Sequence, residues 1–423
     1  MKRMIQALFL MIATLAPAQG VVGRGRTDLS PAELGIVQAH KAISDKPSEY
    51  AGYNLLASAL VVRAQETFDA TLYAQAEDAV KKSLALSPHN FETEKIQASI
   101  LLGAHEYPAA LELAQVLNKR VPDDPTVYGL LTDAEIELGK YDDAENSATW
   151  MLNLRRGNRP ADIRASRLRY LFGDLEGAYE MADLAFQSTV PIEVGERASL
   201  LAQMGQFRLA SRNTDAAEKL LQEALTVFPN YPEAVENLAQ LRMAQKRYAE
   251  SVELCEQLYR GVPRAANLYH LAEAMQLSGR EAEAQKAFAN FEAKARAEME
   301  HKDNSNRELV FYYADHAHKP EKALDVARRE YAWRHDVWTL DEYAWALHVN
   351  GQDAEARKQI ESALSVGVRD EKLFRHAGEI SLRLSDREAA ERYLKQSVEL
   401  NSSDSLPARI ELTHSVAVRA VSP

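Results

Sequence analysis

Residues 125–158 read PTVYGLLTDAEIELGKYDDAENSATWMLNLRRGN, and this stretch decides the fold. A first apolar run around Leu131 is followed by the turn sequence Gly139-Lys140-Tyr141 and by a second run that starts near Ala144. Apolar residues at this spacing are typical of helices. Gly139 stands where the end of a helix needs a left-handed residue. The stretch therefore predicts two antiparallel helices joined by a tight turn.

The same 34-residue spacing returns along most of the chain. Small residues recur at positions eight and twenty of the unit, where a large side chain would push two crossing helices beyond about 8–10 Å. These pairs are Ala98 with Ala110, Ala239 with Ser251, Ala344 with Ala356, and Gly378 with Ala390. Glycine marks the turn at Gly139, Gly279 and Gly351, and proline ends the second helix at Pro88, Pro122, Pro229 and Pro263.

This pattern resembles the tetratricopeptide-repeat family, and about ten units cover residues 47–401. The tryptophan that the family often has at position four is usually missing, and Tyr128 is the nearest substitute. The resemblance implies an all-α fold, a right-handed α-solenoid of antiparallel helix pairs. As a whole, the chain is similar to multi-repeat exported bacterial members of the family. Such proteins bind other proteins or peptides in a concave groove.

The first residues have the composition of a signal peptide. Lys2 and Arg3 precede an apolar run over residues 5–16, and Ala16-Pro17-Ala18 has the small-x-small pattern of a cleavage site. The run is shorter than the roughly 20 residues that span a bilayer. We therefore expect cleavage after Ala18, a periplasmic or secreted bacterial protein, and no stable membrane insertion afterwards. The alternative is an uncleaved anchor.

The expected organisation follows from these features. Ser30-Pro31-Ala32-Glu33 reads as a capping box that opens a helix reaching about Ile43. A polar run at residues 300–306 is the best candidate for a hinge. The expected segments are a signal peptide at 1–18, a disordered lead plus helix at 19–46, a first array at 47–299, a second array at 300–402, and a tail at 403–423.

The composition and net charge of the chain indicate which classes of partner it can bind. The chain has 423 residues and a formal net charge of -12, without a basic run. A nucleic-acid partner needs a basic surface or stripe, so the charge argues against one.

The groove positions of the family, transferred to this chain, predict the binding residues. Mid-chain, Glu233, Glu236 and Glu273 make an acidic stretch. The late groove combines aromatic and charged residues, which is the composition of a binding hot spot. The predicted partner-binding residues are Tyr312, Trp338, Asp341, Trp345, Lys372, Arg375 and Arg383. Trp338 and Trp345 are also compatible with packing in the core between repeats, and both placements stay open.

No catalytic signature is present: there is no phosphate loop, no His-Glu-x-x-His and no Gly-x-Ser-x-Gly. The sequence therefore predicts no enzyme, no cofactor and no metal. Histidines gather at His316, His318, His335 and His348, which leaves a metal-dependent enzyme as a minor hypothesis. The single cysteine, Cys255, falls at an apolar helix position and is expected to be a buried hydrophobic residue.

Two non-catalytic functions remain. The first is an exported scaffold that docks partner peptides or domains in its concave groove. The second is a structural or assembly subunit of a bacterial cell-envelope complex, in outer-membrane or polysaccharide export.

Overall fold

The structure is a computed structural model that describes residues 29–154, 157–302 and 304–401. The signal peptide predicted at 1–18, most of the lead and the tail at 403–423 lie outside the described residues. Within them the chain is all-α, with one short π-helical segment at Tyr312–His316 and no strand. The helices are α1 Pro31–Asp45, α2 Tyr50–Thr67, α3 Thr71–Leu86, α4 Phe91–Gly103, α5 Tyr107–Arg120, α6 Pro125–Glu137, α7 Tyr141–Leu154, α8 Arg159–Leu171, α9 Leu175–Gln187, α10 Val194–Ala210, α11 Thr214–Val227, α12 Pro232–Ala244, α13 Tyr248–Gly261, α14 Ala265–Leu277, α15 Glu281–Glu298, α16 Asn306–Phe311, α17 Pro320–Tyr331, α18 Val337–Val349, α19 Asp353–Val366, α20 Glu371–Arg383 and α21 Arg387–Asn401.

The helices pack as antiparallel pairs, as the 34-residue unit predicts. The small residues at positions eight and twenty are buried where the two helices of a pair meet. Ser251 shows how close the helices come, because its hydroxyl donates a hydrogen bond of 3.0 Å to the carbonyl of Ala239. Larger side chains at either position would separate the two backbones. The prediction of an all-α solenoid of antiparallel helix pairs is confirmed.

The local signals at helix ends are also confirmed. Gly139, Gly279 and Gly351 have φ between +73° and +80°, the left-handed region that the turn requires. The side chain of Ser30 accepts a hydrogen bond from the Glu33 amide, and the Glu33 carboxylate accepts one of 2.8 Å from the Ser30 amide. This capping box opens α1 with Pro31 at its first position. None of the helices in the described part of the chain is long and apolar enough to cross a membrane.

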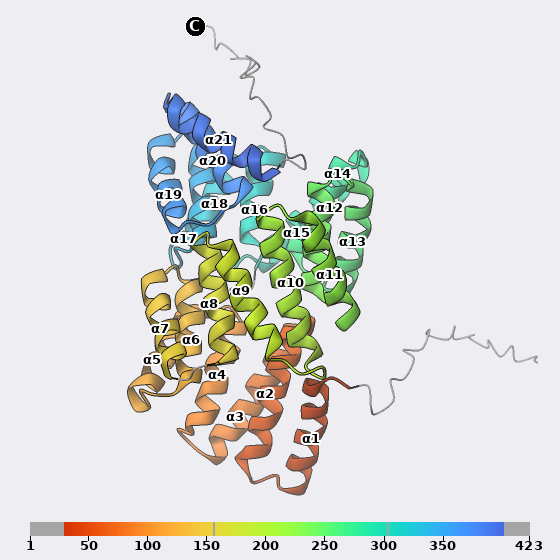
Figure 1. The fold of residues 1–423 in the computed structure, drawn as a ribbon, viewed down its shortest axis with the longest axis vertical. Coiled ribbons are helices and arrows are strands. Elements are labelled where there is room, and N and C mark those ends of the chain that lie inside the picture. The colour runs from red at the N-terminus through yellow and green to blue at the C-terminus, as the bar shows by residue number, and fades with distance from the viewer. Residues whose placement is uncertain (1–28, 155–156, 303, 402–423) are drawn as a thin grey trace, which may run out of the picture.

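The solenoid curls until its later units lie on its earlier ones (Figure 1). Helices α17–α19 rest above α7–α9 in this view, although more than 130 residues separate the two groups. One buried cluster contains residues of both groups, among them Leu171 and Val337. The fold is therefore a superhelix that closes on itself, and not an open arc.

A seam joins the two layers, made by residues 137–141 of the α6–α7 turn and residues 333–337 before α18. The hydroxyl of Tyr141 accepts a hydrogen bond of 2.9 Å from the amide of Val337, 196 positions away. Glu137 lies 3.6 Å from the guanidinium of Arg334. A second contact follows one unit later, where the turn glycines Gly173 and Gly367 meet so closely that neither has room for a Cβ.

The run at residues 300–306, predicted as a hinge, connects α15 to α16 and is tied to α17. The side-chain amide of Asn306 donates a hydrogen bond of 2.6 Å to Glu330, and Asn304 donates to the same carboxylate over 3.3 Å. The unit that follows departs from the 34-residue pattern. Its first helix ends in the π-helical segment, and Pro320 opens α17 after it.

Candidate functional site

Two cavities that are open to solvent lie on the concave side of the superhelix. Their walls come from the first helices of successive units, including α10, α12, α14, α16 and α18. The larger cavity has a volume of about 660 Å³ and the smaller about 330 Å³. Phe68, His105 and Arg264 line both, so the cavities adjoin. We call the two cavities together the central channel.

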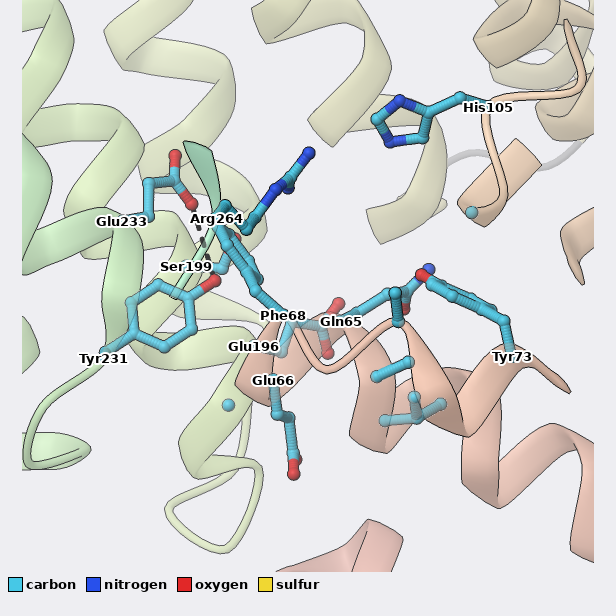
Figure 2. A pocket seen from close by; sticks show the side chains of 15 residues that line it. Gln65, Glu66, Phe68, Tyr73, His105, Glu196, Ser199, Tyr231, Glu233 and Arg264 are labelled. Carbon is cyan, nitrogen blue, oxygen red and sulfur yellow. Dashed lines mark hydrogen bonds between the residues drawn. The ribbon is translucent and has the colours of Figure 1, made fainter. Parts of the chain in front are cut away.

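The larger cavity combines carboxylates with aromatic rings (Figure 2). Tyr231, Ser199 and Glu233 lie on one side of the space, and Tyr73 and His105 lie on the other. The Phe68 ring meets the edge of Tyr231 with 6.4 Å between centroids, which brings the α2–α3 turn against the start of α12.

Glu233 is the least compensated group of this cavity. Its carboxylate accepts a long hydrogen bond of 3.4 Å from the hydroxyl of Tyr231. Burial, and next the nearby charge of Glu236, raise the pKa of Glu233 to about 7. Glu196 differs from Glu233 because its carboxylate lies 3.0 Å from the guanidinium of Arg159. Burial raises the pKa of Glu196, and the positive charge of Arg159 opposes that rise.

The seam forms one wall of the smaller cavity. Arg334 holds Asp336 at 2.6 Å and faces Glu137, so its pKa stays raised although burial alone would lower it. Burial would raise the pKa of Glu137, but Arg167 and Arg334 hold it below its usual range. The wall next to the seam is thus a network of compensated charges.

Two charged groups in the wall of the smaller cavity each have a buried polar atom without a hydrogen-bond partner among the described residues. Glu342 is only 2% exposed, and its Oε2 has no hydrogen-bond partner among the described residues. Burial, and next the charge of Glu330, raise the pKa of Glu342 well above its usual value. Arg307 lies with its guanidinium 4.9 Å from the ring centre of Trp338, and its buried Nε likewise has no partner among those residues.

The structure distributes the seven predicted binding residues over three environments. Trp338 is half-buried and lines the smaller cavity. Asp341 and Trp345 are buried, so the groove placement is wrong for these two, and Trp345 takes the core placement that the sequence left open. Two long-range contacts hold the indole of Trp345. Its Nε1 donates a hydrogen bond of 2.8 Å to Asp315, and its ring stacks on His376 at 4.2 Å.

The other four predicted residues lie outside the channel lining. Tyr312 donates a hydrogen bond of 3.2 Å to Glu292. The Lys372 ammonium lies 4.4 Å from the centre of the Phe311 ring. Arg375 covers Trp345 with 5.6 Å from guanidinium to ring centre, and Arg383 is largely exposed. These residues remain predicted contacts on a second surface.

The clustered histidines take separate partners. His316 packs on Phe288 with 4.3 Å between ring centres, while the Nδ1 of His348 lies 2.6 Å from Asp353. Within the residues that the structure describes, no group of three His, Cys, Asp or Glu side chains is placed to hold a metal ion. Cys255 is buried as expected, and burial raises the pKa of its thiol to about 11.

Part of the channel lining lies at positions that the repeat pattern predicts for the groove. Glu233 and Glu236 stand at groove positions of their unit and were predicted as an acidic stretch. The residues that reach the channel from turns, such as Phe68, His105 and Arg264, carry no such signal. Their spacing within the unit does not show that the superhelix closes over them.

The comparisons with known proteins agree with this fold. A tetratricopeptide-repeat family profile matches residues 208–260. No curated protein matches the sequence.

Among solved structures, the human IFIT1 dimer with PPP-AAAA is 12% identical, with a TM-score of 0.49 over 89% of this chain and 96% of that chain. A monomeric IFIT1 mutant with Gppp-AAAA gives 12% identity and a TM-score of 0.50 over the same shares. PilW, a widely conserved type IV pilus biogenesis factor, is 16% identical, with a TM-score of 0.39 over 49% of this chain and 94% of that chain. The repeating unit, the helix pairs and the profile matched at residues 208–260 together support a protein of the tetratricopeptide-repeat type.

Proposed function

We propose that the chain is an exported, non-catalytic scaffold that binds an extended segment of a partner protein in its central channel. The observation that carries this is the channel itself, two adjoining cavities lined by the concave face of successive units. Stacked repeats give a stiff surface that can make several contacts along one bound chain. Export rests on the sequence of residues 1–18 alone.

The channel offers the contacts that such a segment needs. Aromatic rings of Phe68, Tyr231 and Trp338 supply apolar area, while carboxylates and guanidinium groups supply polar partners. Hot spots of protein interfaces are enriched in these residue types. Trp338 is therefore kept as a predicted contact, and Asp341 and Trp345 are reassigned to the core.

Site-specific photocrosslinking in cells tests the location. A photoreactive residue at Gln65, which is exposed and lines the larger cavity, should yield crosslinked partner proteins. The matched position is Glu223, which is exposed on the second helix of its unit, α11, and lines neither cavity. Equal crosslinking from both positions would contradict binding in the channel. Export is tested separately, by the mass of the mature chain, which should begin at Gln19.

A further inference from the structure

Four carboxyl groups in the channel wall have no ion-pair partner among the residues that the structure describes. Glu233 and Glu236 lie near the start of α12, Glu308 on α16, and Glu342 on α18. None of the four makes an ion pair with another residue of the part of the chain that the structure describes. Carboxylates in a protein interior are normally paired or hydrogen-bonded, because desolvation of an unpaired charge is costly.

Glu342 is the most informative of the four. At 2% exposure its carboxyl group is removed from bulk water, and its Oε2 meets no donor among the described residues. A buried polar atom without a partner needs an explanation. Since Glu342 lines the smaller cavity, a hydrogen-bond donor on a bound guest would satisfy this oxygen.

The cations of the wall do not cancel this acidity. Eight glutamates line the channel against four arginine and lysine side chains. Arg334 is already held by Asp336 and Glu137. Burial would lower the pKa of Arg307, but Glu308 and next Asp341 raise it above its usual value. The electrostatic potential in the channel therefore favours the binding of positively charged groups.

Aromatic rings stand beside the carboxylates. Tyr231 and Phe68 line the larger cavity and Trp338 the smaller one. The Trp338 ring already carries one guanidinium, that of Arg307, at 4.9 Å. Rings of this kind attract cations over their faces. A flexible cationic side chain can thus meet a ring and a carboxylate together.

We infer that the guest of the channel is an extended protein segment that carries arginine or lysine side chains. Glu233 binds its cations at the larger cavity, and Glu236, Glu308 and Glu342 bind them at the smaller one. This rests on the proposed function and names the chemistry of the partner.

The chain itself carries a segment of the same chemistry. Arg24 and Arg26 precede Ser30, whose hydroxyl donates a hydrogen bond of 3.2 Å to Glu66 in the wall of the larger cavity. The test must therefore separate a partner from the chain's own lead.

The test measures fluorescence anisotropy of a short labelled peptide that alternates glycine and arginine, titrated with the mature chain. A peptide with glutamine in place of arginine should bind at least about ten-fold more weakly. The double variant Glu233→Gln/Glu236→Gln should weaken arginine-peptide binding by a similar factor. The control Glu223→Gln/Glu253→Gln removes the same charge from exposed positions outside the channel and should leave binding unchanged. Thermal melts followed by circular dichroism verify that all variants fold.

Three results would overturn the inference. Equal binding of the glutamine peptide, or equal loss in the control variant, shows that channel carboxylates do not select cations. At least ten-fold tighter binding after Arg24→Gln/Arg26→Gln shows that the chain's own lead occupies the channel. If the arginine peptide does not bind while Gln65 still yields crosslinks, the cationic guest is rejected but the proposed scaffold function is not. Loss of both signals rejects the scaffold as well.

Discussion

Replacing Gly139 with alanine should open the seam of the superhelix. A Cβ at this position would overlap the backbone carbonyl of His335 and would lie 2.7 Å from the amide nitrogen of Asp336. Both obstacles are backbone atoms, so no side-chain rotation can relieve the clash. The α6–α7 turn must move away from the segment that precedes α18.

Gly351 provides a matched control. It occupies the same turn position with the same φ of +73°, and a Cβ there would meet nothing within 4 Å. Both substitutions incur the left-handed penalty of about 1–2 kcal/mol. Only Gly139→Ala adds overpacking of about 1–3 kcal/mol and loses the Val337–Tyr141 hydrogen bond, worth about 1 kcal/mol. The expected difference between the two variants is about 2–4 kcal/mol.

Urea unfolding followed by far-ultraviolet circular dichroism measures that difference, and small-angle X-ray scattering measures the dimensions of the folded chain. Gly139→Ala should unfold at a lower urea concentration than Gly351→Ala and should have a larger radius of gyration. Equal midpoints and equal radii would refute the view that the seam closes the superhelix and stabilises it.

Three further predictions follow from single residues. The pKa of Glu233 is about 7 in the folded chain against the usual 4.5, so the folded state loses stability as pH rises from 4.5 to 7. This pKa difference corresponds to a free energy of at most about 3 kcal/mol, which solvent screening in an open cavity reduces to about 1–2 kcal/mol. Glu233→Gln should therefore raise the urea midpoint at pH 8 and change it little at pH 4. Because the Ser251 hydroxyl donates a hydrogen bond to the Ala239 carbonyl, Ser251→Leu should destabilise the chain by about 1–3 kcal/mol and Ser251→Ala by about 1 kcal/mol. Similar urea midpoints for the two variants would contradict the close crossing of these helices. The Cys255 side chain is 4% exposed, and its thiol has a pKa of about 11. It should therefore resist iodoacetamide in the folded chain at pH 8 and react fully in urea. Fast labelling of the folded chain would show instead that Cys255 lies on the surface.

Trp345 shows where reasoning from the repeat stopped. Its position in the unit is compatible with the groove and with the core. The deciding contacts are the hydrogen bond to Asp315 and the stacking on His376, each about 30 residues away in the sequence. These partners belong to the preceding and the following unit, so the unit that contains Trp345 does not by itself identify them.

The helix pairs could be predicted because each one is specified within 34 residues. The turn glycines, the capping box at Ser30 and the small residues at helix crossings act on neighbours a few residues or one helix away. Such local terms do not depend on the rest of the chain. The sequence by itself therefore determined the fold class, the helix boundaries and the buried position of Cys255.

The central channel and its seam were decided only by the tertiary structure. The Tyr141–Val337 contact joins residues 196 positions apart. Whether they meet depends on small rotations between units that accumulate over several repeats, and the sequence pattern of one unit does not show that sum. For the same reason, only the tertiary structure shows that the Oε2 of Glu342 is buried in the channel wall without a hydrogen-bond partner among the described residues.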